Sequence, residues 1–217
     1  MSGNSCDHPE ARAEDLRSGQ GVRAHGIRCS LGLVGLSVLI YPLGVLCHEL
    51  IGHGGVGILC GGRIAQLEIL CIRWWPHLEW IGWNGHYGSC RVVGVESEWC
   101  RHLFALGGSM STFLVSIATI VIARLRRSSR ELQAVLLCLA FWWIDLLTYT
   151  LPSWGLRRSV FWGQTDYSEP LEAAAGLGIP TSVFQTFVLV SCAALAVIST
   201  TTAIRFVRSS QQNVTPH

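Results

Sequence analysis

Residues 31–59 read LGLVGLSVLIYPLGVLCHELIGHGGVGIL. Its first half is almost wholly apolar, and its second half carries His48, Glu49 and His53 within the same apolar run. The run is longer than the ~20 residues that a helix needs to cross roughly 30 Å of hydrocarbon. The sequence therefore predicts a membrane-spanning helix that holds ionisable side chains inside the bilayer.

The composition of the whole chain is typical of a membrane protein. Of its 217 residues, 50% are hydrophobic and 14% are charged, whereas charged residues make up about a quarter of an ordinary soluble domain. The low charge and the nine tryptophans exclude intrinsic disorder for most of the chain. A formal net charge of +2 is too small to suggest a nucleic-acid partner, so the expected surroundings are the lipid bilayer.

Three further stretches are long and apolar enough to cross a bilayer. With the first, the expected spans are residues 31–59, 103–123, 132–151 and 183–204. The sequence thus predicts an all-α polytopic membrane protein with four transmembrane helices, in which residues 29–208 form one membrane-embedded domain. Residues 1–28 are expected to be a disordered cytoplasmic tail, and residues 209–217 a short C-terminal tail.

The arginines indicate how the chain is oriented. They crowd the flank before the first span, the short loop between the second and third spans, and the flank after the fourth, whereas the two other loops carry few for their length. By the positive-inside rule, the sequence predicts an integral multi-pass protein with both termini in the cytoplasm.

The loop between the first two spans is expected to contain β structure. It alternates partly with a two-residue period from Arg63, and it contains Asn84-Gly85, a pair typical of tight hairpin turns. We therefore expect a small β-hairpin insertion over residues 62–95, at the edge of the membrane. Its tryptophans suit an interfacial aromatic belt.

His48, Glu49 and His53 carry the chemistry that the sequence predicts. An ionised group inside an apolar helix is costly unless it is paired or bound to a metal, so such residues indicate a functional site. Catalytic zinc sites use three protein ligands, imidazoles among them, and keep one position for water. The expected cofactor is therefore Zn²⁺, bound by His48 and His53, with Glu49 as general base on the zinc-bound water.

The spacing of the two histidines differs from the usual zinc motif. In H-E-x-x-H the histidines are four residues apart and share a helix face, but here the motif is H-E-x-x-x-H, and five residues place them about 140° apart on an ideal α-helix. A π-type bulge absorbs one residue and brings the two faces back together. We expect such a distortion here, made easier by Gly52 and Gly54.

These residues resemble two known families. HELIGH is similar to the zinc motif of the dipeptidyl-peptidase III family, whose soluble fold is otherwise unlike this chain. The wider context resembles the site-2 protease family of intramembrane zinc metalloproteases. That family carries its zinc motif near the end of a transmembrane helix, often followed by a GGR-like turn with strands and by a helix that opens with small residues. The matching features here are GGR at residues 61–63 and ALGGS at residues 105–109, and the similarity covers roughly residues 40–170.

The resemblance implies that an aspartate further along the chain is the third metal ligand. Asp145 and Asp166 are the two candidates. Asp145 lies at a depth in the third span that matches the depth of His48 in the first. Asp166 follows the third span in a loose echo of the family's Asp-Gly motif, although the asparagine that precedes the proline in that family is absent here. We favour Asp145 as the ligand.

The leading functional hypothesis is an intramembrane zinc metallopeptidase that hydrolyses a peptide bond of a membrane-associated protein. The expected partner is then a membrane protein or peptide substrate. An alternative hypothesis is a catalytically inactive site-2 protease-like membrane scaffold or binding protein, in which the shifted histidines no longer share a metal. A third, less supported by the sequence, is a haem or transported-ion site.

Overall fold

The computed structural model describes residues 9–83, 87–125, 128–155 and 168–212, with side chains for those between 27 and 209. Most of these residues are helical. Four helical segments are long and apolar enough to cross a membrane: Ile27–Leu59, Glu98–Leu125, Arg130–Trp154 and Thr181–Ser209. The four predicted spans are thus confirmed as helices of suitable length and composition, while their insertion into a membrane stays a prediction.

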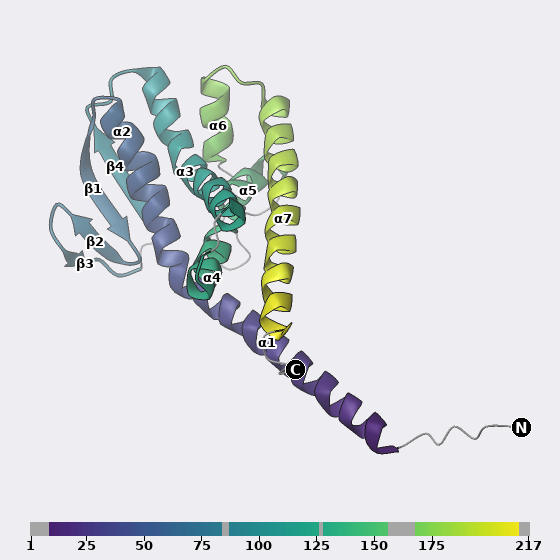
Figure 1. Cartoon of the computed structure of the whole chain (residues 1–217). Helices are drawn as coiled ribbons and strands as arrows, with labels where there is room; N and C mark the ends of the chain where they lie inside the picture. The colour runs from purple at the N-terminus through teal and green to yellow at the C-terminus, as the bar shows by residue number, and fades with distance from the viewer. Residues whose placement is uncertain (1–8, 84–86, 126–127, 156–167, 213–217) are drawn as a thin grey trace, which may run out of the picture.

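The first span is one continuous rod made of three helical types. Helix α1 (Pro9–Leu46) passes into the π-helical segment η1 (Cys47–Gly55), and η1 passes into the short helix α2 (Val56–Leu59). Helix α1 begins within residues 1–28, the segment that the sequence predicted to be a disordered tail. Figure 1 shows this rod running past the small sheet on one side and the remaining helices on the other.

A four-stranded antiparallel sheet follows the first span. Its strand order is β3-β2-β1-β4. The strands are β1 (Arg63–Ile69), β2 (Ile72–Trp75), β3 (Glu79–Trp80) and β4 (Gly88–Val93). The turn between β1 and β2 consists of Leu70 and Cys71, which have φ values of 50° and 68°. Left-handed backbone at both positions is typical of a two-residue type I′ hairpin turn.

The single hairpin that the sequence predicted over residues 62–95 is therefore only part of the sheet. The strand β4 returns to pair with β1 along most of its length, from Arg63 opposite Val93 to Ile69 opposite Gly88. Turn residues do not predict this pairing, because β1 and β4 are not consecutive strands in the sequence. The Asn84-Gly85 turn on which the prediction rested lies outside the described residues.

Helix α3 (Glu98–Leu125) packs closely against η1. A Cβ atom added to Gly52 would lie 2.5 Å from the Cα atom of Gly108 and 2.6 Å from the carbonyl oxygen of Gly107. These distances are too short for any side chain, so the two backbones touch because glycine occupies the contact on both sides. The small-residue patch at residues 105–109 thus brings α3 against the histidine motif.

The third span is a broken helix, where the sequence predicted a continuous one over residues 132–151. It consists of α4 (Arg130–Leu139), α5 (Ile144–Thr150) and the 3₁₀ turn η2 (Leu151–Trp154). Turns at residues 140–143 separate α4 from α5.

Hydroxyl groups from neighbouring helices stabilise this break. The end of a helix leaves carbonyl groups without intrahelical donors, and inside a membrane no water is present to donate hydrogen bonds to them. The carbonyl of Leu139 accepts from the N–H of Trp142 at 3.1 Å and also lies 3.3 Å from Ser116 Oγ of α3. Ser199 Oγ donates to the carbonyl of Ala140 at 3.2 Å. Both serines are fully buried. The break is thus built into the packing of the third span.

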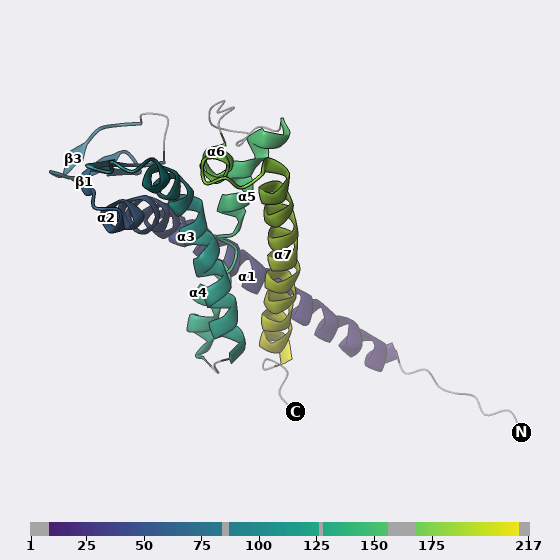
Figure 2. The same ribbon diagram turned by 90° about the horizontal axis from the view of Figure 1, so that it is seen from above.

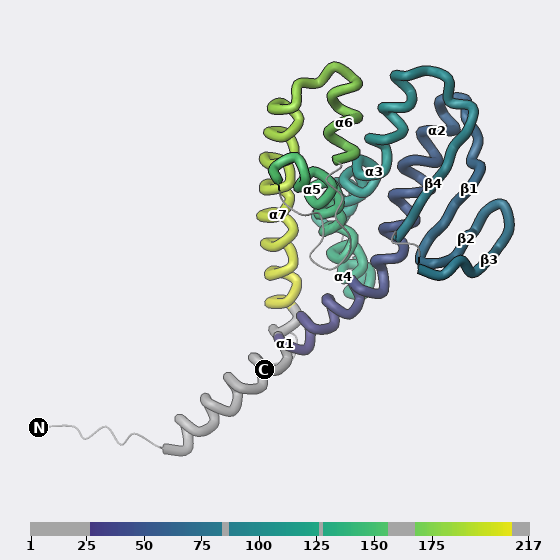
Figure 3. The backbone as a smooth tube through the Cα atoms, turned by 180° about the vertical axis from the view of Figure 1, so that it is seen from behind, coloured from purple at the N-terminus to yellow at the C-terminus, as the bar shows by residue number. Residues whose placement is uncertain are grey.

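The last two helices complete the bundle. They are α6 (Glu169–Gly176) and α7 (Thr181–Gln212), the latter of which carries Ser199. Figure 2 shows α6 between α3 and α7, and Figure 3 shows the sheet on the far side of α3 from α7. Side chains of α3, α5, α6, α7 and the α4–α5 break share one apolar core. Its buried members include Phe113, Trp143, Leu146, Ala174, Phe184 and Val188.

Candidate metal centre

The π-helical segment η1 brings the two histidines of the motif together. Residues five apart are bonded neighbours in a π-helix, so His48 and His53 face the same side. Their Nε2 atoms lie 3.2 Å apart, and each residue is 4% exposed. The π-type distortion that the H-E-x-x-x-H spacing predicted is confirmed.

The other ring nitrogen of each histidine already has a partner. His53 Nδ1 lies 2.8 Å from the carbonyl oxygen of Phe104, and His48 Nδ1 lies 2.7 Å from Oδ2 of Asp145. A carbonyl and a carboxylate only accept hydrogen bonds, so we assign the proton of each neutral ring to Nδ1. Both Nε2 atoms then present lone pairs to each other at 3.2 Å, which is repulsive unless a cation lies between them.

The geometry of this pair fits a tetrahedral metal ion. Zinc binds imidazole nitrogen at about 2.0–2.1 Å, so two nitrogens at a tetrahedral angle are about 3.3–3.4 Å apart. The observed 3.2 Å between the Nε2 atoms is close to that value. Rings of Tyr149 and Phe104 pack on His48 and His53, each with its centroid 4.9 Å from the imidazole centroid.

A third ligand atom comes from Glu169, the first residue of α6. Its Oε1 atom lies 3.8 Å from His53 Nε2, and the ligand atoms of His48, His53 and Glu169 all lie within 4.8 Å of one another. Two imidazoles and one carboxylate form a common ligand set of catalytic zinc. The described residues therefore contain a cluster that could hold a metal ion.

Gly108 of α3 keeps the space beside the two histidines open. A Cβ atom added to Gly108 would lie 2.4 Å from His48 Nε2 and 2.5 Å from His53 Nε2. Any side chain would thus occupy the place next to both ligand atoms. The residues fit a small cation because glycine forms the wall of the site.

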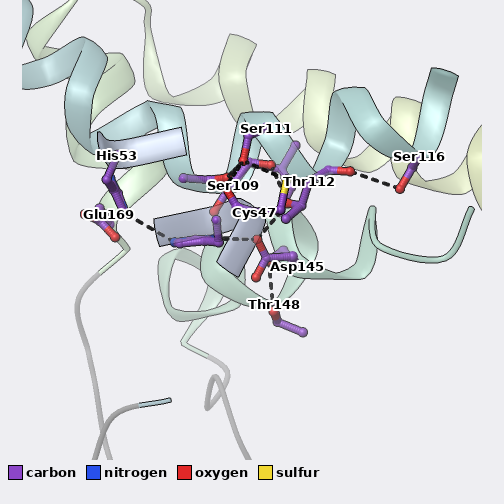
Figure 4. Close-up of polar contacts among 12 residues, drawn as sticks. Cys47, His53, Ser109, Ser111, Thr112, Ser116, Asp145, Thr148 and Glu169 are labelled. Carbon is purple, nitrogen blue, oxygen red and sulfur yellow. Dashed lines mark hydrogen bonds and ion pairs between the residues drawn. The ribbon is translucent and has the colours of Figure 1, made fainter. Parts of the chain in front are cut away.

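The aspartates that the sequence proposed as third ligand are placed differently. Asp145 contacts His48 on Nδ1, and the carboxylate grouped with the two Nε2 atoms is that of Glu169. In Figure 4, His53 and Glu169 lie at one end of the group and Ser116 at the other, with Asp145 and Thr112 between them. The second candidate, Asp166, lies outside the described residues.

Glu49 is buried at the contact between η1 and the sheet, with 6% of its surface exposed. A Cβ atom on Gly88, the first residue of β4, would lie 2.5 Å from Cγ and 2.7 Å from Oε1 of Glu49. Glycine at this strand position therefore makes room for the carboxylate. Burial and, to a smaller extent, the charge of Glu49 raise the pKa of the nearby Cys90 thiol to about 11.

Sequence reasoning missed Glu169 as a member of the site. Glu169 lies in the first turn of the short helix α6, where the helix dipole favours an acidic residue, so its position in the sequence does not by itself indicate a metal ligand. Its approach to His53 depends on how α6 docks. Ser168 Oγ donates to the carbonyl of Tyr149 at 3.0 Å, and a Cβ atom on Gly176 would overlap the ring of His102. No motif spacing signals these contacts.

Comparisons with protein-family models, with curated proteins and with solved structures gave no match. The function is therefore inferred from the motifs in the sequence and from the geometry of the cluster of His48, His53 and Glu169.

Proposed function

We propose that this chain is an intramembrane zinc metallopeptidase that hydrolyses a peptide bond of a membrane-associated protein. The observation that carries the proposal is the pair of buried imidazole nitrogens 3.2 Å apart, with a glutamate directly following the first histidine. Both histidines belong to a helix long and apolar enough to cross a membrane. A metal held there would act on a bond that the bilayer shields from bulk water.

The protein residues have separate roles in this proposal. His48, His53 and Glu169 would hold a zinc ion through Nε2, Nε2 and a carboxylate oxygen. Zinc bound there would polarise a water molecule and the scissile carbonyl. Glu49 would accept a proton from the attacking water and return it to the leaving amine, as a general base and then a general acid.

The position of β4 at the end of the sheet supports substrate binding by strand addition. This strand is the last in the order β3-β2-β1-β4, and it begins at Gly88, against the Glu49 side chain. An extended peptide that paired with β4 by strand addition would run past this carboxylate. Main-chain hydrogen bonds would then hold the substrate extended, as cleavage requires.

The test of this function separates metal binding from cleavage. The Glu49→Gln variant should keep its zinc and lose cleavage, because glutamine preserves the shape but cannot accept the proton. Purified protein is reconstituted in liposomes with a mixture of single-span transmembrane peptides, and new N-termini are identified by mass spectrometry. Glu96→Gln, at an exposed position, is the matched control and should cleave like the wild type. Full cleavage by Glu49→Gln would contradict the assignment of the base.

A second candidate function is a non-catalytic, metal-binding membrane scaffold. It is favoured by the packing of Glu49 against Gly88, outside the group of three metal-ligand atoms. On this hypothesis the wild-type protein binds zinc with the same residues and produces no new N-termini. The same reconstitution therefore distinguishes the two candidates.

A further inference from the structure

Asp145 is linked to the cluster of His48, His53 and Glu169 by a hydrogen bond with His48. It lies in the first turn of α5, directly after the break that follows α4. Its Oδ2 atom accepts a hydrogen bond from His48 Nδ1 at 2.7 Å and one from Thr112 Oγ1 at 2.8 Å. The two nitrogens of an imidazole point in different directions, so a carboxylate on Nδ1 lies away from the atom that would bind the ion.

We propose that Asp145 is a positioning residue that orients His48, held in place by Thr112, and that Glu169 is the carboxylate that contacts the ion. This inference rests on the metal site of the proposed function, but not on peptidase activity. It assigns different roles to the two acids around the histidine pair.

The Nδ1 atoms of the two histidines have different hydrogen-bond partners, which supports this assignment. His53 donates to a neutral backbone carbonyl, that of Phe104, whereas His48 donates to a charged carboxylate. A hydrogen bond to a carboxylate is shorter and stronger, fixes the tautomer and makes Nε2 a better electron donor. His48 should therefore be the stronger of the two imidazole ligands.

Thr112 holds the carboxylate of Asp145 in place. Thr112 is 2% exposed and its hydroxyl also lies 2.9 Å from the carbonyl of Ser109, in its own helix α3. The Asp145 side chain is 26% exposed, so its position depends on such partners. The chain of contacts thus runs from α3 through α5 to η1, and ends at the ligand atom.

The experiment compares metal binding among variants in detergent. Zinc affinity is measured by competition with a chelator, and the Co²⁺-substituted protein is examined by visible absorption. Asp145→Asn keeps the shape and an acceptor oxygen but loses the charge. We expect it to bind zinc about 10- to 100-fold more weakly and to keep the wild-type Co²⁺ spectrum. Glu169→Gln removes a direct ligand, so it should change the Co²⁺ spectrum itself.

A second pair of variants tests whether Thr112 acts through Asp145. Thr112→Val should weaken zinc binding in the same direction as Asp145→Asn, and it should add no further loss to Asp145→Ala. Thr119→Val is the matched control, because Thr119 is also buried on α3 but its hydroxyl bonds only to carbonyls of that helix. It should leave zinc affinity unchanged.

The outcomes against the proposal are distinct. An altered Co²⁺ spectrum in Asp145→Asn together with an unaltered one in Glu169→Gln would make Asp145 the ligand. Wild-type zinc affinity in Asp145→Asn would remove its positioning role. A wild-type protein that binds neither ion would overturn both this inference and the proposed function, whereas metal binding without cleavage would overturn the peptidase alone.

Discussion

Single atoms decide whether the histidine motif can hold a metal. The Nε2 atoms of His48 and His53 are buried, directed at each other and bordered by a glycine. In a helix that crosses a membrane, such a pair of lone pairs is unfavourable unless a cation is shared between them. The site therefore needs a residue without a side chain at position 108 as much as it needs the ligands.

Replacing Gly108 by alanine should abolish metal binding. The new methyl group would lie about 2.5 Å from both Nε2 atoms, where the ion belongs. Zinc content of the purified variant is measured by elemental analysis, together with circular dichroism to check that the helices persist. Gly35→Ala is the matched control, since a Cβ atom there meets nothing within 4 Å. Wild-type zinc content in Gly108→Ala would contradict the position of the site.

At the scale of elements, the break between α4 and α5 is a feature that apolar composition alone does not reveal. The hydropathy of residues 132–151 suits one straight helix, and neither proline nor glycine interrupts it before Pro152. The break is made stable by hydroxyl donors on α3 and α7, which bond to the carbonyls at the end of α4. As a result Asp145 lies in the first turn of a new helix.

Replacing Ser199 by alanine should destabilise the protein by about 0.5 to 2 kcal/mol, because the buried carbonyl of Ala140 loses its hydroxyl donor. The free energy of unfolding is measured with denaturant in mixed micelles. Ser37→Ala serves for comparison, since its hydroxyl is exposed and bonds only to the carbonyl of Leu33 in its own helix. Equal stabilities of the two variants would show that the break does not need Ser199.

For the whole molecule, four helical segments of spanning length predict that both ends of the chain lie on one side of a membrane, because an even number of crossings returns the chain to the side on which it began. The arginine-rich loop between the second and third spans indicates that this side is the cytoplasm. With this topology, the sheet and the turn between α6 and α7 are predicted to lie toward the opposite face.

A green fluorescent protein fused to either end of the chain should therefore fluoresce in a bacterial host, since it folds in the cytoplasm and not after export. The measurement compares fluorescence with the amount of each fusion protein on a blot. A fusion placed after residue 97, between the sheet and the second span, should remain dark. Fluorescence at one end only would require an odd number of spans, and the broken third span would then be the segment that fails to cross.

The local features of this protein can be predicted from its sequence. Apolar runs of sufficient length predict the four long helices, and the five-residue histidine spacing predicts the π-helical distortion of η1, because both depend on residues close together in the chain. The tertiary structure alone decided which carboxylate faces the ligand atoms, that β4 pairs with β1, and that the third span is broken. These features depend on the packing of distant segments: Glu169 meets His53 only because α6 docks between α3 and α7.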